Sequence, residues 1–281
     1  MPTSKKLIHD VDSALQMWGD QVRANRDQAN EYREGVESND FYGPIASQFA
    51  ADPNRTGEQT LDVLRSLGRP EDVWMDIGAG GGRYALPLAL QSKEVIAVEP
   101  SEGMLEVLNT GAAEHNITNV TTVVSRWPME NAPECDISLI SHVGYDIEDI
   151  GPFLDAMEAS SRRLCIAILL VRAPSSLAAP LWPAVHGVER NLLPGLSEFL
   201  AVQLSRGRLC EVRLSRRDAP RYKTVDAPLQ FMRQQMFIQP DGEKDARLQA
   251  ELKLRLKPDG DEFVMNREPM PMGIVSWEPP R

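Results

Sequence analysis

Long apolar runs and clustered cysteines are both missing from this 281-residue chain, and each absence excludes a class of protein. No stretch approaches the roughly 20 apolar residues of a membrane span, and the first residues lack the apolar core of a signal peptide. We therefore expect a cytoplasmic protein with no membrane partner. The three cysteines, Cys135, Cys165 and Cys210, have no metal-binding spacing, so we expect buried reduced thiols and no metal site.

Basic residues are also scarce overall. The chain has 30 Lys and Arg against 41 Asp and Glu, a net charge of -11. Because phosphate contacts dominate nucleic-acid binding, this balance disfavours a nucleic acid and favours a small molecule or a protein as the partner. One segment departs from it: residues 206–223 carry seven basic side chains against Glu211 and Asp218. That segment is either a solvated strand face or a surface for an anionic ligand, and both interpretations stay open.

What the chain does contain is a strand, a glycine turn, a helix and a second strand in succession. An apolar run, 73–77, carries Asp76 and leads into Gly78, Gly80 and Gly82, where a backbone without Cβ atoms turns sharply and approaches a ligand. A second apolar run, 95–98, is followed by Glu99, and a carboxylate there accepts hydrogen bonds from a ribose diol. The pattern predicts a cofactor that contains adenosine.

The glycine spacing distinguishes between the adenosine cofactors. A dinucleotide fingerprint has a small residue at position 83, but Arg83 stands there. The DxGxGxG pattern of Asp76, Gly78, Gly80 and Gly82 instead resembles motif I of the class I S-adenosylmethionine-dependent methyltransferases. S-Adenosylmethionine is cationic and has no phosphate, so an acid before the glycines suits it better than it suits a pyrophosphate.

The resemblance extends from the first to the fifth predicted strand and implies a set of cofactor contacts. It implies that the acid before the glycines holds the cationic amino-acid end of the cofactor, that Glu99 binds the ribose, and that Ser101 and Met104 flank the adenine. At the end of the third strand the family usually has an acid, but this chain has Arg126 and then Trp127. Trp127 either packs on the adenine or anchors the core. The implied cofactor-binding set is Asp76, Gly78, Ala79, Gly80, Gly82, Glu99, Pro100, Ser101, Met104, Arg126, Trp127, Ser141 and His142.

After the fourth predicted strand, 135–142, the family places the loop that faces the methyl acceptor. His142 is a candidate general base, because an imidazole titrates near neutral pH, and Tyr145 is a second acceptor-facing group. The alternative for His142 is that it only shapes the pocket, since transfer from a sulfonium depends more on positioning than on acid–base help. The resemblance implies in-line methyl transfer to an O, N or S atom of a small molecule. Two other functions stay open: S-adenosylmethionine binding without transfer, and a nicotinamide-dependent oxidoreductase.

Alternating apolar strands and amphipathic helices predict a doubly wound α/β fold. Together with the resemblance, they lead us to expect a mostly parallel, seven-stranded Rossmann-like sheet whose last strand is antiparallel. We expect four segments: an N-terminal helical lid (1–56), the cofactor-binding core (57–217), a helical insertion (218–262) and the final strand of the sheet (263–281).

The pattern also predicts where individual elements begin and end. We expect strands over 121–127, 164–171, 208–216 and 273–277 and helices over 83–90 and 150–163. Over 174–194 the repeated prolines predict a loop with short helices. In the strand 208–216, Val212 and Leu214 are expected to point inward and Arg213 outward. Tyr32, Phe41 and Tyr42 form an aromatic turn that either closes over the acceptor or packs on the core.

Overall fold

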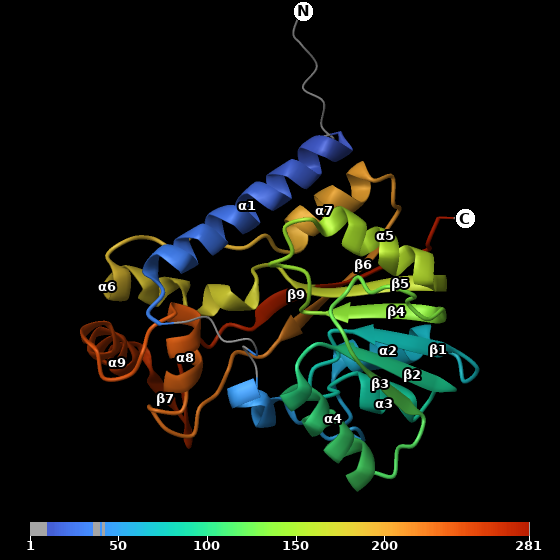
Figure 1. The fold of residues 1–281 in the computed structure, drawn as a ribbon. Coiled ribbons are helices and arrows are strands. Elements are labelled where there is room, and N and C mark those ends of the chain that lie inside the picture. Colours follow the sequence, from blue (N-terminus) through green and yellow to red (C-terminus); the bar gives the residue numbers. More distant parts are fainter. Residues whose placement is uncertain (1–9, 36–39, 41–42, 281) are drawn as a thin grey trace, which may run out of the picture.

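The computed structural model describes residues 10–35, 40 and 43–280 (Figure 1). Phe41 and Tyr42 of the predicted aromatic turn, and residues 1–9 and 36–39 of the predicted N-terminal lid, lie outside the described residues. The described chain begins with helix α1 (Val11–Tyr32), which is followed by the short 3-10 helix η1 (Gly43–Phe49).

One seven-stranded sheet forms the centre of the fold, in the order β3-β2-β1-β4-β5-β9-β6. The pairings β1–β2, β1–β4, β2–β3 and β4–β5 are parallel, and β9 is antiparallel to both β5 and β6. This confirms the mostly parallel doubly wound sheet with an antiparallel last strand. Its central strands are continuous apolar runs because both faces are covered. The strands are β1 (Val73–Ile77), β2 (Glu94–Glu99), β3 (Val120–Val124), β4 (Cys135–Ser141), β5 (Ser161–Leu170), β6 (Glu211–Arg217) and β9 (Met270–Trp277).

Helices cover both faces of the sheet and create two apolar cores (Figure 1). On one face α1, α5 (Ile150–Ser160) and α7 (Leu196–Ser205) enclose a core that contains Trp18, Phe153, Phe199 and Trp277. On the other face lie α2 (Gln59–Leu67), α3 (Ala85–Ala89) and α4 (Glu102–Glu114), around a core that includes Trp74. Since each side chain on a strand points to the face opposite its neighbours, Trp74 and Met75 fall into different cores.

A third apolar cluster lies beyond the carboxyl edge of the sheet, in the lobe at the left of Figure 1. It is centred on Trp182 and includes Met232, Met236 and Leu248. Trp182 comes from the predicted proline-punctuated segment, which contains short helices as expected, and Tyr32 at the end of α1 packs against the cluster. The elements of this lobe are η2 (Pro174–Leu177), η3 (Ala179–Leu181), α6 (Trp182–His186), α8 (Leu229–Met236), α9 (Glu243–Arg255), β7 (Lys257–Asp259) and β8 (Glu262–Val264).

Some predicted boundaries are wrong. β3 ends at Val124, so residues 125–127 follow the strand instead of completing it. α5 ends at Ser160 and β5 starts at Ser161, because Ser161 pairs with Cys135 of β4 and its hydroxyl donates to Ser138 Oγ at 2.6 Å. The helix predicted over 83–90 is shorter, since its first residues remain in the glycine turn.

The predicted orientation of the β6 side chains is also wrong. Leu214 is 74% exposed and Val212 is exposed too, whereas Ser215 is buried. Ser215 faces α2, where its hydroxyl donates to Gln59 Oε1 at 3.2 Å. β6 is the edge strand of the sheet, where side chains on either face can reach solvent, so alternation of polarity alone gave the wrong orientation.

The cysteines largely follow the expectation. Cys135 and Cys165 are buried free thiols, and burial raises their pKa to about 12 and about 11. Cys210 is also free but only half-buried, just before β6. Among the helices that the structure describes, none has both the length and the apolarity to cross a membrane.

Candidate active site

Three loops meet at the carboxyl edge of the sheet where the strand order reverses, between β1 and β4. The glycine turn follows β1, residues 99–101 follow β2, and residues 142–145 follow β4. Because these strands are parallel neighbours, their following loops lie side by side at one edge. Crevices at this position are the usual ligand sites of open α/β sheets.

The glycines of the turn serve two different purposes. Gly78, Gly80 and Gly82 have φ values of +75°, +53° and +82°, in the left-handed region that other residues avoid. A Cβ on Gly78 would lie 2.4 Å from Val143 Cγ2, and one on Gly82 would lie 2.9 Å from Leu108 Cγ, so these two permit close packing. A Cβ on Gly80 would meet nothing within 4 Å. Gly80 therefore faces open space at the site.

Glu99 joins two of the loops. Its carboxylate accepts the Gly80 backbone N–H at 2.9 Å and the Ser101 backbone N–H at 2.9 Å, while the side chain is only 7% exposed. Burial raises the pKa of Glu99, and these two N–H groups oppose that rise. A carboxylate held by backbone donors on both sides is fixed in place and presents its remaining lone pairs to a ligand.

Asp76 is a buried acid without a cation beside it. It is 3% exposed, and no ion pair to it forms among the described residues. Burial and, to a lesser extent, the negative charge of Glu99 raise its pKa from 3.8 to about 7, although a hydrogen bond from the Ala85 backbone partly opposes the shift. Two neighbouring buried carboxylates repel each other, so this end of the site is electrostatically suited to a positive ligand.

A third acid, Asp40, reaches the same place from the N-terminal segment. It accepts the Ser101 hydroxyl at 2.8 Å and the Gly43 backbone N–H at 2.8 Å, and its charge also raises the pKa of Glu99. Ser101 in turn caps α4 by accepting the Met104 N–H at 3.2 Å. The sequence offers no signal for Asp40, because it lies 61 positions from Ser101 and belongs to no motif.

The predicted cofactor contacts after β1, β2 and β3 differ in exposure. Met104 and Ala79 are buried, whereas Pro100 and Arg126 are exposed. The half-buried indole of Trp127 donates its N–H to the Phe153 carbonyl at 3.1 Å and packs against the α5 core. Trp127 thus has the core-packing role that the sequence analysis gave as one of two alternatives. Its contact with the adenine stays a prediction.

The predicted catalytic pair is assembled in the loop after β4. His142 Nδ1 lies 3.3 Å from Tyr145 Oη, which accepts the Leu170 backbone N–H at 2.7 Å. His142 has φ +57°, which is uncommon outside glycine, and its own N–H donates to the Ile168 carbonyl at 2.9 Å. The half-buried Ser141 precedes the pair.

Burial keeps both side chains neutral. Burial and, to a lesser extent, the positive charges of Arg217 and Arg83 lower the pKa of His142 to about 3. Burial also raises the pKa of the Tyr145 phenol above its ordinary value. A neutral imidazole can accept a proton, but one this reluctant to become charged is a weak base near neutral pH.

Helix α1 holds the acceptor loop from the outside. The Trp18 indole N–H donates to the Ile147 carbonyl at 2.8 Å, and Arg26 pairs with Glu148 at 2.7 Å. Arg23 also hydrogen-bonds Glu148. The N-terminal segment therefore constrains the loop that carries His142, although the sequence motifs lie elsewhere.

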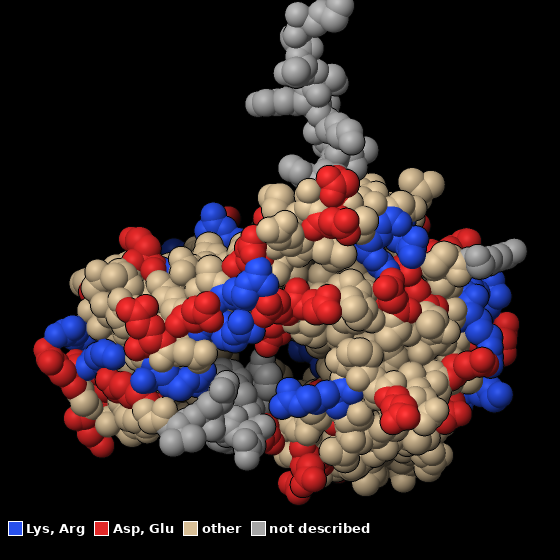
Figure 2. Space-filling model, turned by 45° about the horizontal axis from the view of Figure 1, so that its top comes forward, with Lys and Arg blue, Asp and Glu red and all other residues tan. Residues whose placement is uncertain are grey.

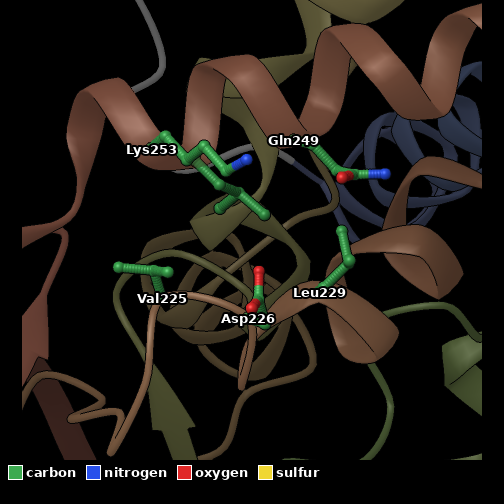
Figure 3. Close-up of a pocket in the computed structure, with 6 residues that line it drawn as sticks. Val225, Asp226, Leu229, Gln249 and Lys253 are labelled. Atoms are coloured by element: carbon green, nitrogen blue, oxygen red, sulfur yellow. The ribbon is translucent and has the colours of Figure 1, made fainter.

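The surface is hollowed between the core and the left-hand lobe, and both basic and acidic side chains border the opening (Figure 2). A separate small depression lies within that lobe, between α8 and α9 (Figure 3). Val225, Asp226 and Lys253 line it, but it has no room for a water molecule and no motif residue reaches it. Among the described residues, no group of three or more His, Cys, Asp or Glu side chains is placed to hold a metal ion.

The comparison with protein families matches residues 75–159 to a methyltransferase domain. Three curated relatives each align over about 42% of this chain. An uncharacterized protein of Haemophilus influenzae is 25% identical over 121 residues, and a mitochondrial small-subunit ribosomal RNA methyltransferase of Arabidopsis thaliana is 26% identical over 120. A probable cobalt-precorrin-6B C(15)-methyltransferase of Methanobrevibacter smithii is 20% identical over 122. The matches span 44%, 31% and 65% of these relatives.

Solved structures share the fold. The YcgJ protein of a Bacillus species superposes with a TM-score of 0.55 at 13% identity, covering 79% of this chain and 99% of the other. A magnesium protoporphyrin IX methyltransferase of Synechocystis, solved with S-adenosylhomocysteine, gives a TM-score of 0.50 at 12% identity, covering 94% and 99%. The resemblance to class I S-adenosylmethionine-dependent methyltransferases is confirmed.

Proposed function

Because residues 75–159 match a methyltransferase domain, we propose that this protein binds S-adenosylmethionine and transfers its methyl group in line to an O, N or S atom of a small molecule. The observation that carries the proposal is the pair of buried carboxylates, Asp76 and Glu99, beside the open space over Gly80. When bound, the cofactor supplies an electrophilic methyl group on a sulfonium. The cytoplasmic location expected from the sequence belongs to the same proposal.

The residues at the glycine turn fit a cation and do not fit a diphosphate. S-Adenosylmethionine carries positive charge on its ammonium and sulfonium groups, which offsets the repulsion between Asp76 and Glu99. The pyrophosphate of a dinucleotide would bring negative charge toward the same acids, and Asp40 would add to the repulsion. This electrostatic argument favours the methyltransferase over the nicotinamide-dependent oxidoreductase.

Each part of the site has a proposed role. Asp76 and the Gly78–Gly82 turn would hold the amino-acid end of the cofactor, and Glu99 would bind the ribose hydroxyls with the lone pairs that its two backbone donors leave free. Met104 and Trp127 would border the adenine. Ser101 already caps α4 and bonds Asp40, so it would act by fixing the loop.

His142 and Tyr145 would orient the acceptor. Tyr145 Oη accepts one hydrogen bond from the backbone, so its proton is available for His142 Nδ1 or for an acceptor atom. Neutral side chains suit a reaction whose barrier falls mainly through alignment of the reacting atoms, which contributes about 7 kcal/mol or more in favourable cases. If His142 acts as a general base, its weakly basic ring would have to accept the acceptor's proton during the transfer.

A small-molecule acceptor is favoured over RNA by charge. The net charge of -11 opposes a polyphosphate backbone, and most of the basic residues in segment 206–223 are ion-paired within the protein. One curated relative is a ribosomal RNA methyltransferase, so RNA is the second candidate acceptor. Retention of structured RNA at physiological salt would favour that candidate.

The test is calorimetric titration of the full chain with S-adenosylmethionine, S-adenosylhomocysteine and NADH. We expect both sulfur compounds to bind and NADH to bind far more weakly. Preferential NADH binding would refute the methyltransferase. Binding of S-adenosylmethionine without methyl transfer to any member of a broad acceptor panel would favour the alternative of a non-catalytic binding protein.

A further inference from the structure

The basic segment 206–223 divides into paired and unpaired residues. Five of its seven basic side chains form ion pairs with acids: Arg206 and Arg208 with Glu158, Arg213 with Glu211, and Arg221 and Lys223 with Glu262. Among the described residues, neither Arg216 nor Arg217 forms an ion pair. These two residues are neighbours on β6, so their side chains leave opposite faces of the sheet.

Arg217 lies at the carboxyl edge. β6 is antiparallel to β9, which is antiparallel to β5, so β6 runs parallel to the strands that carry the cofactor motifs. Arg217 is its last residue and pairs with Met270. Ser215, two positions earlier and on the same face, hydrogen-bonds Gln59 at the start of α2. Arg217 therefore extends past the start of α2 toward the site.

A second guanidinium lies beside it. Arg83, directly after the glycine turn, pairs with Glu58 at 2.9 Å and is 48% exposed. Glu58 also accepts Arg55 Nε at 2.7 Å and the Tyr84 hydroxyl at 3.0 Å, so this one carboxylate already serves three donors. Arg217 is exposed, but the protein around it removes part of its hydration and lowers its pKa, and the like charge of Arg83 lowers the pKa further. Glu58 forms no ion pair with Arg217 among the described residues, and its charge is the smallest of the contributions that oppose this lowering.

The strand register brings Arg217 to the edge of the sheet that holds the proposed catalytic pair. Tyr145 Oη accepts the Leu170 backbone N–H at 2.7 Å. Leu170 pairs with Met272 of β9, and Arg217 pairs with Met270, two positions earlier on that strand. In agreement with this placement, the pKa of His142 is lowered by burial and then by the positive charges of Arg217 and Arg83.

We propose that Arg217, supported by Arg83, forms a subsite for an oxyanion, a carboxylate or phosphate group, on the methyl acceptor. A planar guanidinium with free N–H donors binds such a group in two parallel hydrogen bonds and orients the molecule that carries it. The inference rests on the proposed function and names its substrate class: a small anionic acceptor. The carboxylate of S-adenosylmethionine itself is the other oxyanion that Arg217 would bind.

The experiment labels arginines with phenylglyoxal in the full chain saturated with S-adenosylhomocysteine and locates the labels by peptide mass spectrometry. The probe is phenyl phosphate, and uncharged benzamide is its control. We expect phenyl phosphate to slow labelling of Arg217 about fivefold or more, because the bound oxyanion occupies its N–H groups. Arg216, equally without an ion pair but on the other face of β6, is the internal control and should be labelled at an unchanged rate.

Several outcomes would overturn the subsite. They are no protection of Arg217, equal protection of Arg216, or equal protection by benzamide. Protection of Arg217 by S-adenosylhomocysteine alone would assign the guanidinium to the cofactor carboxylate instead. Arg217→Gln should weaken phenyl phosphate binding about tenfold and leave S-adenosylhomocysteine affinity within about twofold, with Arg216→Gln as the matched variant. Failure of the proposed function would appear separately, as absence of S-adenosylhomocysteine binding in the wild-type protein.

Discussion

Replacing Asp76 with Asn should stabilise the free protein and weaken cofactor binding. The ionised carboxylate is buried without a cation, and its pKa rises from 3.8 in a solvated chain to about 7 in the fold. Three pH units at 1.36 kcal/mol each correspond to ~4 kcal/mol of unfolding free energy lost when the group is charged. Asn has nearly the same shape and no charge, so Asp76→Asn should recover a stabilisation of that order at pH above the folded pKa.

The pH dependence gives the sign of the effect. Because the folded state of the wild type holds the Asp76 proton more tightly than the unfolded chain does, ionisation of Asp76 lowers stability as pH rises from about 4 to about 7, and the loss is constant above that. The difference between Asp76→Asn and wild type should therefore be largest at about pH 8 and small at about pH 4.5. Urea unfolding at both pH values measures it.

The same variant should lose affinity for S-adenosylmethionine. A lost hydrogen bond to a charged group weakens binding by about 1.5–3 kcal/mol, and calorimetry measures this directly. Asp72→Asn is the matched control at the other end of β1, because Asp72 is equally buried but pairs with Arg163 and accepts the Arg69 N–H at 2.7 Å. That variant should lose stability and keep cofactor affinity. If Asp76→Asn is no more stable than wild type at the higher pH, the conclusion that Asp76 carries a buried charge without a compensating cation is wrong.

Three further outcomes are expected. Glu99→Gln should weaken S-adenosylhomocysteine binding by about 1.5–3 kcal/mol in calorimetry, because the charged acceptor for the ribose is lost; unchanged affinity in a folded variant would remove the ribose assignment. Gly78→Ala should lower the free energy of unfolding by about 2 kcal/mol or more in urea unfolding, because its Cβ would overlap Val143 and its φ is +75°. Gly80→Ala should lower it by only about 1 kcal/mol and should mainly weaken cofactor binding, because its Cβ enters open space. If both variants lose stability equally, the space over Gly80 is not a ligand site. The His142 ring resonances should not titrate between about pH 5 and pH 8 in NMR spectra, because burial holds the pKa at about 3, and a midpoint near 6.5 would contradict the neutral ring.

The sequence by itself determined the order of the central elements and the motif that defines the family. Strand β1 matches its predicted range, and the glycine turn and Glu99 follow their strands as expected, because a run of apolar residues and a glycine spacing are local properties. The antiparallel last strand was also predictable. Boundaries that depend on a neighbouring strand, such as the start of β5 at Ser161, were not.

Only the tertiary structure decided the electrostatics of the site. Asp40 and Arg217 belong to no motif, and they reach the carboxyl edge through pairing and packing between segments far apart in the chain. Which basic residues of 206–223 are neutralised depends on acids on other elements, such as Glu158 of α5. The pKa of His142 likewise depends on burial and on charges from two other elements. Charge compensation and desolvation are sums over spatial neighbours, so no pattern along the chain contains them.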